Sequence, residues 1–171
     1  MSEVLTKEEE QEMIEYGIER LKANCIGGLI ILGSGLFFGV FRESILFFIV
    51  FYLLRRYVGG YHADTQKRCY IISFSIILFS ICLIKYINKG TIICLILQTI
   101  NIVIIYLLAP VGNANRMLDE FEIRRYRKKA RFWASITYVL ACYFYINSFF
   151  NVANSIGVGN CMVGCLLIAG E

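Results

Sequence analysis

The chain has 171 residues, of which 58% are hydrophobic, and its mean hydropathy is +0.64. Soluble domains are about 45–50% apolar, so this composition excludes an ordinary soluble domain and favours a lipid bilayer as the solvent. The net charge of +4 would favour nucleic acid as a partner only if the basic residues lay on a soluble domain. They flank apolar segments instead, and we expect no nucleic-acid binding.

Residues 6–22 predict an amphipathic helix. Thr6 and Glu9 form a capping-box pattern, and apolar residues at helical spacing make a stripe on one face. We expect residues 1–24 to form a cytoplasmic surface helix that either packs on its neighbour or docks a substrate. Because these residues are polar and acidic, they argue against a cleavable signal peptide.

The remainder, residues 25–171, predicts an all-α membrane domain. Residues 25–41 form a charge-free run of 17, at the lower limit for a span, in which Gly35 and Gly39 have the spacing that permits close helix packing. Residues 44–54 supply only 11 apolar residues, about 16 Å of helix. This segment is therefore either extended by its polar flanks or partly re-entrant.

Three further apolar stretches cover residues 70–84, 91–115 and 132–170. The last is charge-free for 39 residues, about 58 Å as a single helix, which exceeds the thickness of a bilayer. Three asparagines mark the expected turn between two helices: Asn147, Asn151 and Asn154. The sequence thus predicts about six transmembrane segments, the second one short.

The distribution of Lys and Arg predicts the orientation. With the N-terminus inside, segments 1–24, 55–69 and 116–131 are inside and contain 3, 4 and 7 of the 17 basic residues, against 3 elsewhere. Basic residues favour the cytoplasmic side of a membrane. We expect a multi-pass plasma-membrane protein with its N-terminus and segment 55–69 in the cytoplasm.

Seven cysteines are present, an odd number, and most lie inside apolar runs: Cys25, Cys69, Cys82, Cys94, Cys142, Cys161 and Cys165. This distribution argues against a disulfide framework, since a cysteine in an apolar run behaves as a small hydrophobic residue. Cys69 is the exception, because charged residues lie beside it.

The segment RRYVGGYHADTQKRCYIIS, residues 55–73, contains the one histidine, His62, together with Cys69. Cys69 lies where a polar loop becomes an apolar helix, so the helix dipole and the adjacent Lys67 and Arg68 favour its thiolate. A neutral imidazole within reach would accept the thiol proton. The ingredients of a Cys–His dyad are therefore present in a segment expected to face the cytoplasm.

A straight helix would place His62 and Cys69 about 10.5 Å apart along its axis, so a dyad requires the chain between them to bend. Gly59 and Gly60 permit unusual backbone angles just upstream of the histidine. Two nearby polar residues are candidates for orienting the imidazole: Asp64 and Gln66.

The spacing of one histidine and one cysteine leaves two interpretations open, a dyad and an unremarkable pair. A metal site is disfavoured because two ligands are too few, and we expect no metal or other cofactor.

This segment resembles the signature of the accessory gene regulator B (AgrB) family, integral membrane cysteine endopeptidases of Gram-positive quorum sensing. The family pattern has two arginines, two glycines and His-Ala, and then, with six residues between the histidine and the cysteine, Cys-Tyr. It is filled here by Arg55, Arg56, Gly59, Gly60, His62, Ala63, Cys69 and Tyr70. A second stretch, LAPVGNANRMLDEFEIRRYRKKA, resembles the family's Pro-Val segment before a basic cytoplasmic loop, with Pro110, Val111, Asn115 and Leu118 matching.

The resemblance implies an activity and a partner. AgrB proteins cut a small amphipathic propeptide, AgrD, and join its new carboxyl end to an internal side chain as a thiolactone or lactone. It implies that Cys69 is the nucleophile, that His62 is the general base and acid, and that the chain acts as a homodimer. Arg55 and Arg56 then either anchor a helix end at the bilayer or bind the propeptide's acidic tail, and loop 116–131 contacts lipid headgroups.

Two alternatives belong to other classes: a small membrane exporter of a signalling peptide, and a non-catalytic scaffold. A transport pathway shows ionisable residues within its spans, and the predicted spans have essentially none away from their ends. A scaffold predicts no special reactivity at Cys69.

Overall fold

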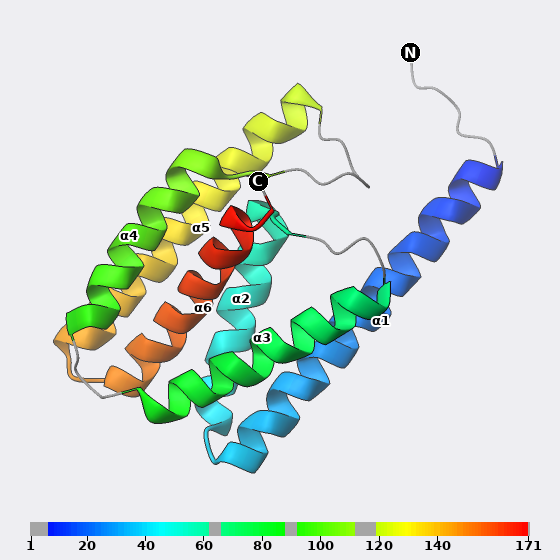
Figure 1. The fold of residues 1–171 in the computed structure, drawn as a ribbon. Helices are drawn as coiled ribbons and strands as arrows, with labels where there is room; N and C mark the ends of the chain where they lie inside the picture. The colour runs from blue at the N-terminus through cyan, green and yellow to red at the C-terminus, as the bar shows by residue number, and fades with distance from the viewer. Residues whose placement is uncertain (1–6, 62–65, 88–91, 112–118, 171) are drawn as a thin grey trace.

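The computed structural model describes residues 7–61, 66–87, 92–111 and 119–170, and this part of the chain is all-helical, as predicted (Figure 1). Its six helices are α1 (Lys7–Phe38), α2 (Phe41–Val58), α3 (Gln66–Tyr86), α4 (Ile92–Leu108), α5 (Glu120–Ile146) and α6 (Phe150–Ile168). Within these ranges the one extended pairing is an isolated parallel bridge between Gly59 and Val111.

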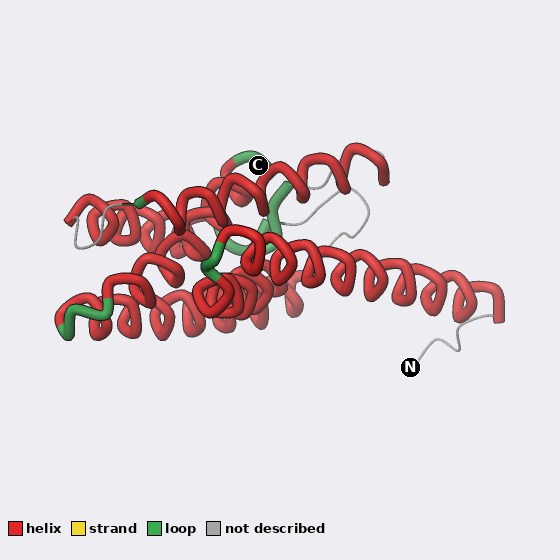
Figure 2. Tube along the Cα trace, turned by 90° about the horizontal axis from the view of Figure 1, so that it is seen from below, coloured by secondary structure: helices red, strands yellow, loops and turns green. Residues whose placement is uncertain are grey.

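Helix α1 is one continuous helix of 32 residues, so the predicted boundary at residue 24 does not interrupt it. The apolar positions on one face keep their helical spacing through this point, from Leu21 to Cys25 and Leu29, and no proline breaks the backbone. The sequence therefore changes from polar to apolar near residue 24 while the helix continues without a break. Its N-terminal half extends beyond the other helices (Figure 2).

Helix α2 contains the short apolar segment together with its polar flanks. It has 18 residues and includes Arg42 and Glu43 in its first turn and Arg55 and Arg56 in its last. The segment is thus extended by its polar flanks to about 27 Å, close to the thickness of a hydrocarbon core of about 30 Å.

The long apolar stretch divides into two helices at residues 147–149. Ser148 adopts a positive φ of 64° in this turn. Asn147 caps α5, as the predicted turn requires, but Asn151 and Asn154 lie inside α6. Asn154 is buried there, so its polarity marks an interior contact and not the turn.

Helix α6 is the central element of the bundle. It packs against α2, α3, α4 and α5, and 11 of its 19 residues are buried, from Ala153 to Leu167. Its glycines allow side chains of α4 to approach closely, because a Cβ at Gly157 would overlap Gln98 and one at Gly164 would overlap Asn101. Small residues of this kind are typical of close helix contacts within membranes.

A buried polar contact joins three helices at this interface. Asn101 Nδ2 of α4 donates to Asn160 O of α6 at 2.7 Å, and Thr137 Oγ1 of α5 donates to Asn160 Oδ1 at 3.0 Å. All three side chains are at most 5% exposed. Since an unpaired polar group in an apolar interior is costly, these bonds fix the register of α4, α5 and α6.

The pair α1 and α3 covers the other side of α2. A second apolar cluster joins them through buried side chains of α1, α2, α3 and α6: Ile31, Phe47, Ile77, Ile81, Ile84 and Val158. Gly35 of α1 lies at the contact between α1 and α2. A Cβ there would overlap Ser44 Oγ of α2, and α1 ends at Phe38, before Gly39. The Gly35 face is therefore used within one chain.

One of the described helices, Phe150–Ile168, is long and apolar enough to cross a membrane by length and composition alone. Three shorter apolar helices have 10–17 residues: Asn24–Phe38, Tyr70–Tyr86 and Ile92–Leu108. Large apolar side chains are exposed along the outer helices, for example Leu29 of α1, Phe79 of α3 and Leu107 of α4. An exposed apolar surface of this extent is typical of contact with lipid or a partner.

The contact between α1 and α2 gives a first prediction. Replacing Gly35 by Leu forces a side chain into Ser44, and overpacking of this kind costs about 1–3 kcal/mol. The variant Gly35→Leu should therefore unfold at a lower temperature than the unaltered protein in detergent. The matched control is Gly33→Leu, because Gly33 has nothing within 4 Å. Equal melting temperatures for the two variants would contradict this packing.

Candidate functional site

The segment after α2 turns sharply at two glycines. Gly59 has a φ of 76° and Gly60 a φ of 108°, a backbone region that side-chain-bearing residues rarely adopt. A Cβ at Gly59 would overlap the carbonyl oxygen of Val111, and one at Gly60 would lie 2.5 Å from the carbonyl oxygen of Leu166. Both glycines of the predicted motif are thus required by conformation and by space.

The two motif stretches found in the sequence meet at this turn. Gly59 and Val111 form the parallel bridge, and the Val111 N–H donates to the Val58 carbonyl oxygen at 3.1 Å. The last residue of α2 is thereby joined to the segment that follows α4. Each stretch was recognisable in the sequence, but nothing in either one predicted the pairing.

The Arg55 side chain binds the backbone of this turn. Its Nη1 donates to the Gly59 carbonyl oxygen and its Nη2 to the Tyr61 carbonyl oxygen. These carbonyls lie beyond the end of α2, where no helical N–H reaches them. The guanidinium supplies two donors in a fixed fork, so it fixes both carbonyls at once. This contact belongs to neither of the two roles expected for Arg55.

Arg56 has different surroundings from Arg55. It is exposed, and its guanidinium lies 5.7 Å from the centre of the Tyr57 ring. The Nζ of Lys129 lies 5.3 Å from the same ring, and Tyr126 of α5 packs against it at 6.1 Å. The end of α2 therefore lies beside the basic first half of α5.

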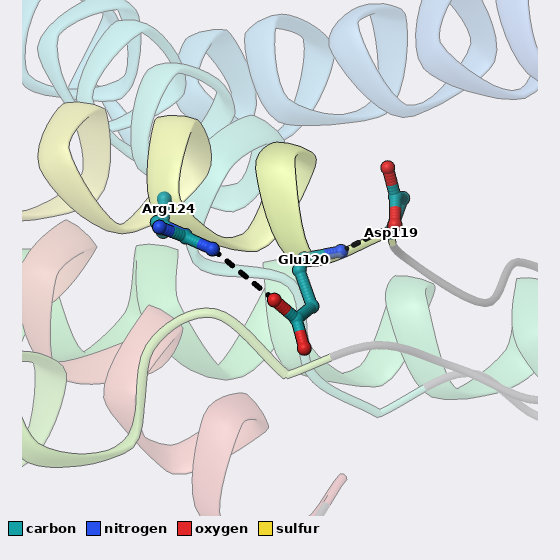
Figure 3. A network of polar contacts seen from close by, with 3 residues as sticks. All are labelled: Asp119, Glu120 and Arg124. Atoms are coloured by element: carbon teal, nitrogen blue, oxygen red, sulfur yellow. Dashed lines mark hydrogen bonds and ion pairs between the residues drawn. The ribbon is translucent and has the colours of Figure 1, made fainter.

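The start of α5 is capped and strongly basic. The Asp119 side chain accepts from the Glu120 N–H at 2.7 Å, and Glu120 pairs with Arg124 at 3.1 Å (Figure 3). Residues 119–131 contain six basic and three acidic side chains. Four of the basic ones are exposed: Arg124, Arg125, Arg127 and Lys128. They form a basic surface on the helix that packs beside the end of α2.

The C-terminal end of α6 also reaches the turn, a contact that sequence reasoning missed. The Tyr61 N–H donates to the Leu166 carbonyl oxygen at 2.8 Å. A Cβ at Gly170 would overlap Tyr61 N and lie 2.5 Å from the carbonyl carbon of Gly60. A glycine after an apolar helix is a signal for a helix end, but it does not reveal which segment the end contacts.

Helix α3 begins at Gln66, about four residues earlier than the sequence predicted, and Cys69 is the fourth residue of its first turn. The first N–H groups of a helix have no partner within the helix and give this end a partial positive charge. Lys67 and Arg68 lie in the same turn, and Arg68 is exposed. The backbone of Cys69 therefore lies in the turn that carries this partial positive charge.

The other predicted site residues are placed only in part. His62 and Asp64 lie outside the described residues, and for Gln66 and Cys69 the description covers the backbone alone. The described chain ends at Tyr61, directly before His62, and resumes at Gln66 in α3. In the ranges that the structure describes, no three or more His, Cys, Asp or Glu side chains are grouped so that they could hold a metal ion.

The described site is thus a glycine turn held by α2, by the segment after α4 and by the end of α6. It is followed in the chain by a helix N-terminus that bears a cysteine, in an all-helical protein. The chain matches the family model of accessory gene regulator B over residues 1–168, and it belongs to this family. This confirms the resemblance seen in the sequence and assigns the chain to the accessory gene regulator system of quorum sensing.

Curated relatives agree with this family. The chain is 25% identical to AgrB-like protein 2 of Clostridium perfringens over 170 residues, which covers 91% of this chain and 78% of the relative. It is 27% identical to the accessory gene regulator protein B of Staphylococcus carnosus over 148 residues, covering 85% and 75%. No solved structure matches the chain significantly.

The different surroundings of the two arginines give a second prediction. Arg55→Ala removes two donors to loop carbonyls, and hydrogen bonds to charged groups contribute about 1.5–3 kcal/mol each. Amide hydrogen exchange should therefore accelerate at residues 59–61 and at Val111. Arg56→Ala is the control and should leave the exchange of these amides unchanged, since its side chain is exposed. Equal acceleration in both variants would show that Arg55 does not hold the turn.

Proposed function

We propose that the protein is a membrane-embedded cysteine endopeptidase that cleaves an AgrD-like amphipathic propeptide and cyclises it. The observation that carries the proposal is the position of Cys69 in the first turn of α3, directly after a turn that is anchored up to Tyr61. The residue that follows this anchor is His62. An anchored residue directly before the histidine and a helix N-terminus at the cysteine support these two roles.

The chemistry assigns one role to each residue. The Cys69 thiolate attacks the carbonyl of the scissile amide, and the amide C–N bond breaks to leave an acyl-enzyme thioester. His62 accepts the thiol proton and gives it to the leaving amine. A cysteine or serine side chain of the propeptide then attacks the thioester, loses its proton to His62, and releases Cys69 with a thiolactone or lactone ring.

The membrane environment favours ring closure over hydrolysis. Exchange of one thioester for another is nearly neutral in free energy, whereas water would convert the acyl-enzyme irreversibly to a free acid. A site at the membrane boundary excludes water. Insertion of the propeptide in the same bilayer makes ring closure effectively intramolecular, which raises its rate.

The basic surface beside the end of α2 suits the acidic tail of the propeptide. Arg56 of α2 and the exposed basic residues of α5 lie on neighbouring elements, and opposite charges would steer an acidic peptide toward them. The side chain of Arg55 is bound to the loop carbonyls, so we assign tail binding to Arg56 and not to Arg55. The sequence predicted segment 116–131 as a loop, but its residues from Glu120 onward form the start of α5. We propose that this segment contacts both lipid headgroups and the tail.

We further propose a multi-pass arrangement in the plasma membrane, with the N-terminus and segment 55–69 in the cytoplasm. The proposal rests on the distribution of the basic residues and on the exposed apolar side chains of the outer helices. Because of the family resemblance we also propose that the chain acts as a homodimer. Its interface would lie away from Gly35, since Ser44 of the same chain occupies the space beside that glycine.

The roles of Cys69 and His62 give a third prediction. Cys69→Ala and His62→Ala should each abolish cleavage of the propeptide and leave insertion in the membrane intact. The control replaces the other six cysteines by Ala or Ser. These are free thiols on the transmembrane helices, and appreciable cleavage should remain: Cys25, Cys82, Cys94, Cys142, Cys161 and Cys165. A Cys69→Ala protein that still cuts the propeptide would refute the peptidase assignment.

The orientation gives a fourth prediction. Single cysteines introduced at positions 56, 66 and 127 of a cysteine-free chain should react with an impermeant thiol reagent only when it reaches the cytoplasmic side. A cysteine at position 88 should react from outside. If position 66 is labelled from outside, the proposed location of the site is wrong.

A further inference from the structure

The turn before His62 depends on an element that the proposed chemistry does not use, the last turn of α6. We propose that this turn, together with Gly170, is a positioning element of the active site that sets where His62 stands relative to Cys69. The inference rests on the proposed function for the roles of those two residues. It adds a remote part of the chain to the site.

The contact between α6 and the turn involves the backbone on both sides. The Leu166 carbonyl oxygen accepts the Tyr61 N–H at 2.8 Å. Within an α-helix this carbonyl would accept from the residue four positions later, Gly170. The Gly170 N–H donates instead to Leu167 O at 3.2 Å, so the Leu166 carbonyl is available to the loop. The helix end is thus shaped to receive Tyr61.

The backbone around Gly170 lies too close to the turn for residue 170 to carry a side chain. A Cβ at Gly170 would overlap Tyr61 N, and one at Gly60 would lie 2.5 Å from the Leu166 carbonyl oxygen. The two backbones are therefore in direct van der Waals contact from both sides. Any side chain at residue 170 must push Tyr61 away from Leu166, and Tyr61 directly precedes His62 in the sequence.

Buried contacts of α6 hold the helix on both sides of Leu166 and further along its length. Val163 and Leu167, which flank Leu166 by one helical turn and one residue, are 0% exposed. The buried bond from Asn101 to Asn160 fixes the same helix two turns earlier. Arg55 and Val111 hold the turn from α2 and from the segment after α4, but α6 alone contacts Tyr61 through its backbone N–H among the described residues.

Substitution at Gly170 tests the proposal. Gly170→Ala should lower the kcat for propeptide cleavage at least tenfold and leave KM within about twofold, because the tail-binding surface lies on α5. The neighbouring variant Ala169→Ser is the control, since the Ala169 side chain is exposed, and its kcat should match that of the unaltered protein. A Gly170→Ala protein with kcat within twofold of the unaltered protein would overturn the proposal.

A second readout separates this proposal from the proposed function, because it needs no propeptide. The rate of alkylation of Cys69 by iodoacetamide is measured against pH in a chain whose other cysteines are replaced. We expect the profile of Gly170→Ala to shift toward that of His62→Ala, while Ala169→Ser keeps the original profile. If the unaltered protein cleaves no propeptide yet these profiles differ as described, the proposed function fails and the positioning role stands. Superimposable profiles for Gly170→Ala and the unaltered protein would refute the positioning role.

Hydrogen exchange on the unaltered protein covers the case in which Gly170→Ala does not fold. The Tyr61 amide should exchange as slowly as amides in the middle of α6. Rapid exchange at Tyr61 would show that the Leu166 contact does not hold the turn, and would overturn the proposal without any variant.

Discussion

The structure depends on how backbone carbonyls are satisfied where helices end inside a largely apolar bundle. A helix leaves its last carbonyls without partners, and in lipid or in a protein interior no water is present to bind them. At the end of α2 the chain meets this constraint with the Arg55 guanidinium, and Arg131 of α5 donates in the same way to Tyr106 O in the last turn of α4. At the end of α6 the Leu166 carbonyl accepts the Tyr61 N–H. The same bonds that complete the helices also fix the segment that leads to the candidate site.

The central helix α6 connects this junction to the rest of the fold. Its small and polar residues would be poor spanning residues at a lipid-facing position, but here they are enclosed by four other helices. Asn160 links α4 and α5, and the glycines admit the amide side chains of α4. The position of the C-terminal turn of α6 is therefore set by buried contacts along the whole helix, and this is why it can serve as a reference point for a loop.

The sequence predicted the features that local patterns encode. The all-α class, the turn near Asn147 and the motif from Arg55 to Cys69 are all readable from periodicity, charge and spacing, and the family match agrees with that motif. The continuity of α1 was missed because a change in polarity was taken for a structural boundary. Asn154 was taken for a turn residue, since an asparagine buried inside a helical bundle has the same local sequence signature as one in a turn.

The contacts that shape the site were not predictable, because they join residues far apart in the chain. Gly59 contacts Val111, and Tyr61 contacts Leu166, more than a hundred positions away. The glycines at 59 and 60 indicated a special backbone, but not the carbonyls that occupy the space of their missing side chains. Arg55 and Arg56 are adjacent and chemically identical, so only their surroundings in the fold distinguish a residue that holds the loop from one exposed to a partner.

The central claim is that Cys69 forms a covalent acyl intermediate with the propeptide, and the most direct measurement is the mass of the intact chain during turnover. The protein is mixed with an AgrD-like propeptide, quenched in acid within the first turnover and analysed by mass spectrometry. The account predicts a chain heavier by the mass of the N-terminal propeptide fragment less one water, attached at Cys69 and released by hydroxylamine as a thioester would be. Cleavage of the propeptide with no adduct on the chain, or with an adduct on another cysteine, would contradict it.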